Sequence, residues 1–191
     1  MLRYTLYGIL PALAVGTGLF AYQWSRPGNT AQAYGAPFTL VDQRGETITE
    51  KAFRDHPTAI FFGFTHCPEI CPTTLFELDG WLAELGDEGK DIRAFFVSVD
   101  PERDTPEVLG DYVSSVSQRI IGITGEPDKI AEMVKDFRIY AKRIELDDGD
   151  YTMDHTASVI LLDSNGAFAG TIAYGEDPDT AMAKLKRLAS G

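Results

Sequence analysis

Cysteine, histidine and basic side chains are scarce in this chain. Its 191 residues include two cysteines, three histidines, and 17 lysines and arginines against 29 aspartates and glutamates. Two cysteines cannot build the multiple-disulfide framework that holds small secreted folds together. The formal charge of −12 makes nucleic acid and anionic lipid surfaces poor partners for the protein. The chain also lacks internal repeats and low-complexity tracts.

Charge is absent from one long segment at the amino terminus. No charged residue occurs between Arg3 and Arg26, and the residues between them are almost entirely apolar. Because about 20 apolar residues are enough to cross a bilayer, we predict that residues 1–26 form a transmembrane anchor with its flanks. A cleaved signal peptide is the alternative, since Ala-Gln-Ala at positions 31–33 offers a small-residue cleavage pattern.

The remaining residues, 27–191, suit a single domain. Without the two arginines of the predicted anchor, this domain has 15 basic and 29 acidic residues and a formal charge of −14. Arg3 and the free amino terminus favour a cytoplasmic start. We therefore expect a single-pass protein of the inner membrane with its domain in the periplasm. The acidic surface serves solubility, or else docks a basic patch on a partner.

Strand and helix patterns alternate along this domain. A continuous apolar run predicts a buried strand at 59–63, and further strands are predicted at 92–99, 120–124, 139–146, 156–162 and 168–174. Helical spacing predicts helices from Pro72 to Gly86, from Pro106 through Val113, and at 127–137 and 179–189, with a short hairpin over 38–48 leading in. The order is β-α-β-α, an inserted β-α-β, a β-hairpin and a last helix. It predicts an α/β, thioredoxin-like fold with a central mixed sheet.

Both cysteines lie in one turn of this predicted fold. Cys67 and Cys71 follow the first buried strand, at the carboxyl end where α/β sheets place their chemistry. A spacing of four residues lets the two side chains form a disulfide or clamp one ion. His155 precedes its strand, so it lies at the same edge of the sheet if that strand runs antiparallel to the first. Two thiols and one imidazole should therefore converge.

A structural disulfide explains the cysteine pair poorly. Closing a loop of about 5 residues contributes roughly 2 kcal/mol, against about 4.7 kcal/mol for a loop of about 100 residues. Redox or metal chemistry is the better interpretation. Soft thiolates favour copper(I), zinc or iron–sulfur iron, and two thiolates with one imidazole suit copper in either oxidation state. A structural zinc site would want a fourth protein ligand, and none is obvious.

Other polar residues near the cluster have ordinary explanations. His66 is expected to point away from the cysteine pair as a turn residue, and His56 to lie on the surface. Asp100, at the end of the second buried strand, either hydrogen-bonds His155 or the motif backbone as support for the site, or is a strand-end turn residue. Turn polarity or packing accounts for the remaining three, Glu69, Met153 and Asp154.

Three motifs together resemble the Sco/SenC family. They are Gly63-Phe64-Thr65-His66-Cys67-Pro68-Glu69-Ile70-Cys71-Pro72, Val99-Asp100-Pro101-Glu102-Arg103-Asp104-Thr105-Pro106 and Asp154-His155-Thr156-Ala157. The resemblance covers essentially the whole chain, including a single amino-terminal membrane anchor. It implies a copper-binding, thioredoxin-fold protein that helps to assemble the binuclear copper centre of cytochrome c oxidase. It also implies that the copper ligands are Cys67, Cys71 and His155.

Three functions fit these residues to different degrees. A copper metallochaperone, the preferred interpretation, would pass its ion by ligand exchange to the copper-site subunit of the oxidase, or exchange it with other copper carriers. The helix amino terminus should then favour thiolate at Cys71 especially. The alternative, a thiol-disulfide reductase, would use Cys67 and Cys71 as a redox-active pair, with thiol reductants as partners, and need not use His155. A peroxidase-like sensor needs an arginine beside its reactive cysteine, and no such pattern is evident.

Overall fold

The computed structural model describes residues 33–147 and 149–191, so the predicted anchor at 1–26 lies outside the described part of the chain. Within that part, none of the helices combines the length and the apolar character needed to span a bilayer. Its elements are β1 (Thr39–Asp42), β2 (Thr47–Thr49), η1 (Glu50–Phe53), β3 (Thr58–Gly63), α2 (Ile70–Glu84), α3 (Asp87–Lys90), β4 (Arg93–Ser98), α4 (Pro106–Val116), β5 (Ile120–Thr124), α5 (Pro127–Asp136), β6 (Ala141–Glu145), β7 (Tyr151–His155), β8 (Ser158–Leu162), β9 (Phe168–Ala173) and α6 (Pro178–Ala189).

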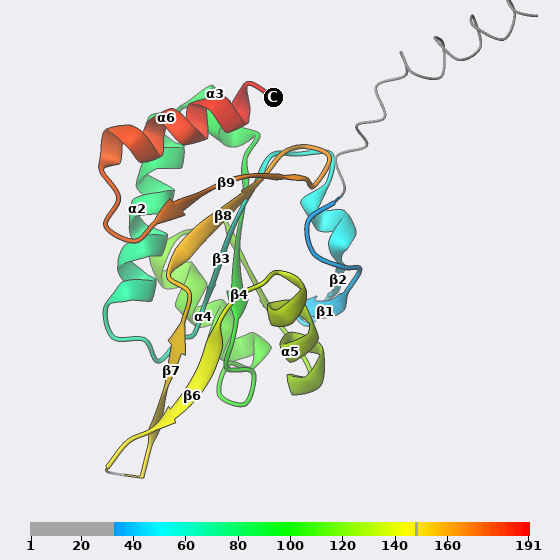
Figure 1. Cartoon of the computed structure of the whole chain (residues 1–191), viewed down its shortest axis with the longest axis vertical. Helices are drawn as coiled ribbons and strands as arrows, with labels where there is room; N and C mark the ends of the chain where they lie inside the picture. Colours follow the sequence, from blue (N-terminus) through cyan, green and yellow to red (C-terminus); the bar gives the residue numbers. More distant parts are fainter. Residues whose placement is uncertain (1–32, 148) are drawn as a thin grey trace, which may run out of the picture. The chain divides into compact units, whose positions relative to one another are not determined.

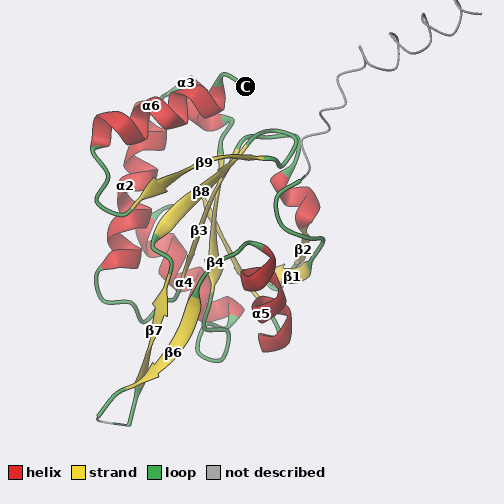
Figure 2. Cartoon of the chain, in the orientation of Figure 1, coloured by secondary structure: helices red, strands yellow, loops and turns green. Residues whose placement is uncertain are grey.

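Strand β3 lies between β4 and β8 in a seven-stranded mixed sheet with the order β2-β1-β5-β4-β3-β8-β9 (Figures 1 and 2). It pairs in parallel with β4 and antiparallel with β8, and β5 continues the parallel set beyond β4. All six residues of β3 are buried, as expected of a strand that is covered on both faces. The antiparallel pairing of β3 with β8 confirms the condition that brings His155 to the cysteine edge.

Helices cover both faces of this sheet (Figure 1). The crossover helices α2 and α4 contact each other on one face, because β3, β4 and β5 succeed one another in the same direction across the sheet. Helix α6 packs on α3 and β9. Helix α5 lies across the sheet from α2 and α4 (Figure 1). Thr105 accepts a hydrogen bond from the Val108 amide and Pro106 opens α4, which confirms the predicted cap.

The inserted segment differs from the prediction. Strand β6 does not join the central sheet; it pairs antiparallel with β7 in a separate two-stranded sheet. Strand β7 is not predictable from the sequence, because Tyr-Thr-Met-Asp-His contains no apolar run and its residues are only partly buried or exposed. His155 is consequently the last residue of a strand instead of part of a loop before one.

Two helical details also correct the prediction. Helix α2 begins at Ile70, so Pro72 is its third residue instead of its first. Proline is tolerated there because the first four amides of a helix have no partner within the helix. The predicted break around Gly86 and Gly89 contains a one-turn helix, α3, in which Gly89 is buried. A Cβ atom at Gly89 would lie 2.1 Å from the Leu82 carbonyl oxygen, so this close approach requires glycine.

Candidate metal centre

A tight turn between β3 and α2 holds the two cysteines. The backbone leaves the sheet at Gly63, where a Cβ atom would lie 2.8 Å from the Cys71 sulfur and 2.7 Å from a ring carbon of Phe96. Only glycine therefore leaves room for Cys71 to pack against the strand. Cys71 is fully buried, while Cys67 is half-buried at the surface, and the two thiols are free.

Strand β7 brings His155 to the same place. The Nε2 atom of His155 lies 3.6 Å from the Sγ atom of Cys71, and the ligand atoms of Cys67, Cys71 and His155 all lie within 4.8 Å of one another. The edges of Phe61 and Phe64 pack against the imidazole, with ring centroids 6.0 and 5.7 Å away. The structure thus gathers the three residues that the sequence selected, from positions 84 residues apart.

A backbone contact fixes which nitrogen of His155 faces the sulfurs. The Nδ1 atom lies 3.1 Å from the Thr156 carbonyl oxygen. Because a carbonyl oxygen only accepts hydrogen bonds, Nδ1 is the protonated nitrogen. In the neutral ring, Nε2 then carries its lone pair toward the cysteines. Histidine metal ligands use this same arrangement, in which one ring nitrogen donates to a carbonyl and the other binds the ion.

The pKa values of the two thiols are shifted in opposite directions. A hydrogen bond from the Cys71 thiol, helped by the amides of Cys71 and Glu69, lowers the pKa of Cys67 to about 4. The same contact between the sulfurs, together with burial, raises the pKa of Cys71 well above its usual range. The prediction that Cys71 is the more acidic thiol is therefore wrong. Burial of Cys71 outweighs the helix terminus, and Cys67 holds the negative charge.

The Cys67 sulfur also caps helix α2. The capping residue, Glu69, makes no side-chain hydrogen bond to the helix. Instead the Cys71 amide donates to the Cys67 sulfur across 3.4 Å, so a thiolate occupies the position of a capping oxygen. A negative charge is favourable at this end of a helix dipole. Cys67 stands just outside the helix and Cys71 in its first turn, so the two cysteines do not share a helical face.

The buried carboxylate of Asp104 holds the cysteine turn in place through hydrogen bonds. Its oxygens accept hydrogen bonds from the Thr65 amide at 3.1 Å, the Thr65 hydroxyl at 2.6 Å and the Ser98 hydroxyl at 2.6 Å. Its own carbonyl accepts from the Thr124 hydroxyl at 2.8 Å. Asp104 therefore ties the motif backbone to β4 and β5. The sequence pattern did not single out this residue, although it lies in the second of the three motifs and directly precedes the helix cap Thr105.

Asp100 has the second of the two roles predicted for it, that of a strand-end turn residue, since its carbonyl accepts hydrogen bonds from the Arg103 and Asp104 amides. It accepts a hydrogen bond from the Tyr151 hydroxyl at 2.8 Å and pairs with Arg103. These contacts hold the start of β7 against the loop after β4, so Asp100 positions the strand that ends in His155 but touches neither His155 nor the motif backbone.

The remaining predicted neighbours stay outside the cluster. His66 is exposed, with its Nδ1 atom 3.1 Å from the Thr65 hydroxyl. His56 contacts Arg93 at the far end of β3. Of the three assigned to turn polarity or packing, Glu69 and Asp154 are exposed and Met153 packs against the core.

These features define a thioredoxin-like protein with a three-residue soft-metal cluster at the carboxyl edge of its sheet. The SCO1/SenC family model matches residues 26–190. The chain therefore belongs to the SCO1/SenC family.

Relatives in this family come from mitochondria and from bacteria. Protein SCO2 of Saccharomyces cerevisiae mitochondria is 36% identical over 157 residues, covering 81% of this chain and 52% of that protein. The SCO2-like protein RP587 of Rickettsia prowazekii is 38% identical over 136 residues, covering 70% of this chain and 66% of that protein. The chain spans about half the length of the mitochondrial relatives it matches.

Two solved structures of copper-bound relatives superpose on the chain. Bradyrhizobium japonicum ScoI with copper bound is 46% identical, with a TM-score of 0.75 over 82% of this chain and 99% of that one. Yeast Sco1 with copper bound is 33% identical, with a TM-score of 0.76 over 83% of this chain and 90% of that one.

Proposed function

We propose that the protein is a copper metallochaperone that binds one copper ion through Cys67, Cys71 and His155. The convergence of these three ligand atoms within 4.8 Å supports the proposal. Two sulfurs and an imidazole form a donor set that copper accepts in either oxidation state. The copper-bound relatives of the same family support the choice of metal.

The cluster is suited to transfer more than to storage. Cys67 and His155 are only half-buried, so a partner's ligands can approach the ion and replace them one at a time. Cys67 is already a thiolate near neutral pH, whereas Cys71 must release its proton when the ion arrives. The client that we propose, on the family resemblance, is the copper-site subunit of cytochrome c oxidase, whose binuclear copper centre would receive the ion.

Replacing His155 tests the ligand set. Copper(I) can be satisfied mainly by the two sulfurs, while copper(II) makes more use of the imidazole. We expect His155→Ala to weaken copper(II) binding more than copper(I) binding, and to remove the intense thiolate-to-copper(II) charge-transfer band. The matched control is His66→Ala, which removes an exposed imidazole one residue from Cys67. Retention of both ions by His155→Ala would exclude His155 as a ligand.

A thiol-disulfide reductase is the second candidate function. The pairing of an accessible, acidic Cys67 with a buried, protonated Cys71 favours it, because an exposed thiolate attacks a disulfide and the second thiol resolves the mixed intermediate. The two functions differ over His155, which copper transfer uses and thiol exchange need not.

A test in cells separates the two functions. If copper delivery is the duty, cells carrying only His155→Ala should fail to assemble the oxidase copper centre, while the purified variant still exchanges thiols. Oxidase activity and the copper-centre absorption of isolated membranes measure assembly. Normal assembly in these cells would overturn the chaperone assignment in favour of the reductase.

We further propose that residues 1–26 anchor residues 27–191 to the inner membrane, with the domain in the periplasm. The uncharged apolar segment between Arg3 and Arg26 supports this arrangement. An oxidase copper site outside the cytoplasm would then be within reach of the tethered domain.

A further inference from the structure

The β6–β7 hairpin leaves one edge without a partner strand. In the two-stranded sheet, β6 pairs only with β7. The Thr156 amide bonds the Tyr140 carbonyl and the Leu146 amide bonds the Asp150 carbonyl, so the even-numbered residues of β6 exchange hydrogen bonds with β7. By the alternation of antiparallel ladders, the amides and carbonyls of Ala141, Arg143 and Glu145 point away from β7. No described residue bonds these main-chain groups.

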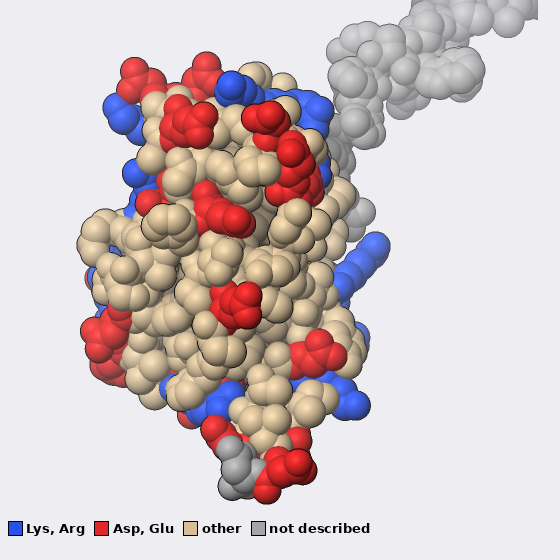
Figure 3. All heavy atoms as spheres, turned by 90° about the vertical axis from the view of Figure 1, so that its left-hand side faces the viewer, with Lys and Arg blue, Asp and Glu red and all other residues tan. Residues whose placement is uncertain are grey.

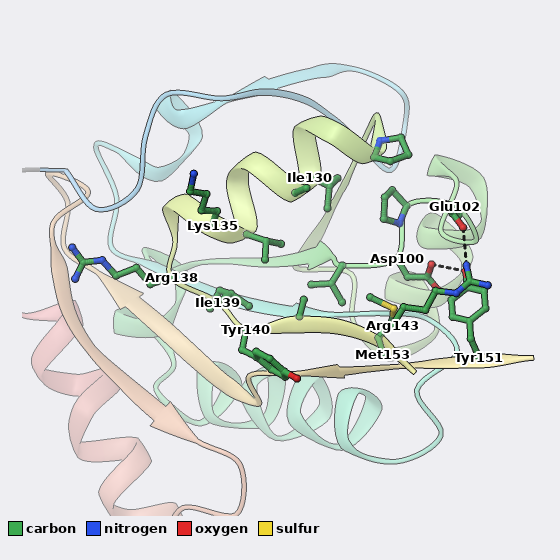
Figure 4. Close-up of a pocket in the computed structure, with 16 residues that line it drawn as sticks. Asp100, Glu102, Ile130, Lys135, Arg138, Ile139, Tyr140, Arg143, Tyr151 and Met153 are labelled. Carbon is green, nitrogen blue, oxygen red and sulfur yellow. Dashed lines mark hydrogen bonds and ion pairs between the residues drawn. The ribbon is translucent and has the colours of Figure 1, made fainter. Parts of the chain in front are cut away.

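A cavity of about 730 Å³ adjoins this edge. Figures 1 and 4 place β6 between β7 and α5, so the unpaired edge of β6 is on the α5 side. The cavity wall is mainly apolar: α5 contributes Ile130 and Val134, the following turn contributes Ile139, and β7 contributes Met153. Its size lies within the range of ordinary ligand sites. An extended segment lying beside β6 could place alternate side chains on this wall.

Cationic side chains flank the cavity in an otherwise acidic protein. Lys135 and Arg138 lie at one end and Arg143 at the other (Figure 4). Arg143 stacks on the Tyr151 ring, with its guanidinium carbon 3.5 Å from the ring centroid, and pairs with Glu102. Among the described residues, Lys135 and Arg138 form no ion pair. This end of the cavity therefore complements an acidic ligand.

Arg138 occupies a backbone position that favours glycine. Its φ of 56° is left-handed, which only two non-glycine residues of the described chain adopt. The Arg138 amide bonds the Lys135 carbonyl and the Ile139 amide bonds the Val134 carbonyl, so Arg138 stands just after the helix in a Schellman-type cap, where glycine is usual. Keeping an arginine here has a conformational cost, which a role for its guanidinium would offset.

From these observations we propose that β6 is a docking edge for an extended, acidic segment of a partner protein, which adds as a third strand to the hairpin. Main-chain hydrogen bonds to Ala141, Arg143 and Glu145 supply the pairing, the apolar wall takes alternate side chains, and Lys135 and Arg138 take the carboxylates. The docking edge requires no copper, so it stands apart from the proposed metal function.

The test uses the full-length protein in detergent and a fluorescein-labelled heptapeptide that alternates valine with glutamate. Fluorescence anisotropy should show saturable binding. The same peptide with lysine in place of glutamate should bind at least tenfold more weakly, and a version methylated on alternate amide nitrogens should not bind. Equal binding of the methylated peptide would overturn strand addition.

Two variants locate the peptide. Ala141→Pro removes an outward amide without touching the β6–β7 ladder and should weaken binding at least tenfold, while Ala141→Val adds similar bulk, keeps the amide and should bind normally. Arg138→Gly should weaken binding about threefold to fivefold, the size of one exposed ion pair, with an equal or higher melting temperature. Lys186→Ala, which removes an exposed charge on α6, is its control.

The outcomes separate this docking edge from the metal site. All the variants should bind copper as the unmodified protein does, whether or not the peptide binds. Unchanged peptide affinity in both Ala141→Pro and Arg138→Gly would overturn the docking edge. A concentration-dependent dimer that Ala141→Pro abolishes, in protein that binds no peptide, would overturn it too, because a second copy would then occupy the edge.

Discussion

At the scale of single residues, the candidate site depends on a difference between two chemically identical side chains. One proton shared between the sulfurs of Cys67 and Cys71 stabilises the charge on Cys67 and opposes charge on Cys71. Half-burial makes Cys67 the accessible thiolate, and full burial makes Cys71 its hydrogen-bond donor. The metal-free site is therefore already divided into a nucleophile and a proton holder.

We predict that iodoacetamide labels Cys67 and spares Cys71 in the metal-free, reduced protein. Because thiolate is the reactive form and the pKa of Cys67 is lowered to about 4, the labelling rate should change little between pH 5 and pH 8 and fall below pH 4. Cys71→Ala removes the donor, so the rate should then rise with pH toward the ordinary thiol range near about 8.5. Mass spectrometry of quenched samples measures both sites.

Cys67→Ala serves as the control for this labelling, since the remaining thiol of Cys71 should stay unlabelled until the protein unfolds. Labelling of both cysteines at equal rates, with a common midpoint near pH 8, would contradict the division of roles between them.

Sequence alone identified the three residues of the candidate site, but not the order of their pKa values or the carboxylate that supports them. Cys67, Cys71 and His155 follow from spacing and topology, because strand direction fixes which ends of the strands meet. The order of their pKa values does not follow, since it depends on how deeply Cys71 is buried. The sequence suggests Asp100 as the carboxylate that supports the motif backbone, whereas Asp104 has this role in the structure. The conformation of the turn after β4 determines which of the two aspartates contacts the cysteine turn, and the sequence pattern does not predict it.

At the scale of elements, the buried strands were predictable and strand β7 of the exposed hairpin was not. Strands β3, β4 and β8 carry continuous apolar runs because both of their faces are covered. Strand β7 is held by its ladder with β6, by Tyr151 on Asp100 and by two guanidinium groups that stack on the Tyr151 ring. These contacts leave no periodic apolar signal. The strand that carries His155 was thus the one that the sequence pattern did not predict.

The contacts of Asp104 link the cysteine turn to β4 and β5, which leads to a prediction about stability. Asp104→Asn keeps the shape but replaces one acceptor oxygen with an amide that faces the donors from Thr65 and Ser98. Leaving a buried donor unsatisfied costs about 1–3 kcal/mol, so the free energy of unfolding should fall by about that amount. Urea denaturation at pH 7 measures it, with Asp111→Asn on the exposed side of α4 as the control.

The pH dependence of this difference has a definite sign. Burial raises the pKa of Asp104 above its ordinary value, although hydrogen bonds from Ser98 and Thr65 oppose the shift. The folded state then binds the proton more tightly than the unfolded state, so this carboxyl loses stabilising influence as the pH rises through its folded pKa. The unmodified protein should gain stability relative to Asp104→Asn as the pH falls from 7 through the folded pKa toward the ordinary carboxyl range of about 4. A constant difference over this range would show that Asp104 does not titrate there.

At the scale of the whole molecule, the net negative charge favours basic partners over acidic ones. Acidic side chains are spread over the face that Figure 3 shows, and lysines and arginines lie mainly toward its margins. With a formal charge of −12, the protein should associate faster with basic partners at low salt and lose this advantage as ionic strength rises. The proposed docking edge on β6 is a local exception, so one molecule could hold an acidic segment there while a basic surface approaches elsewhere.

The proposed membrane anchor also belongs to the scale of the whole molecule, and the proposal rests on the uncharged span between Arg3 and Arg26. We predict that the full-length protein sediments with membranes and resists extraction at alkaline pH, because a bilayer-spanning segment is released only by detergent. Protease added to intact spheroplasts should degrade the domain if it faces the periplasm, while a cytoplasmic protein stays intact as the control. Recovery of a mature chain that begins at Tyr34 would establish cleavage after Ala33 instead, and the copper site would then act as a freely diffusing carrier.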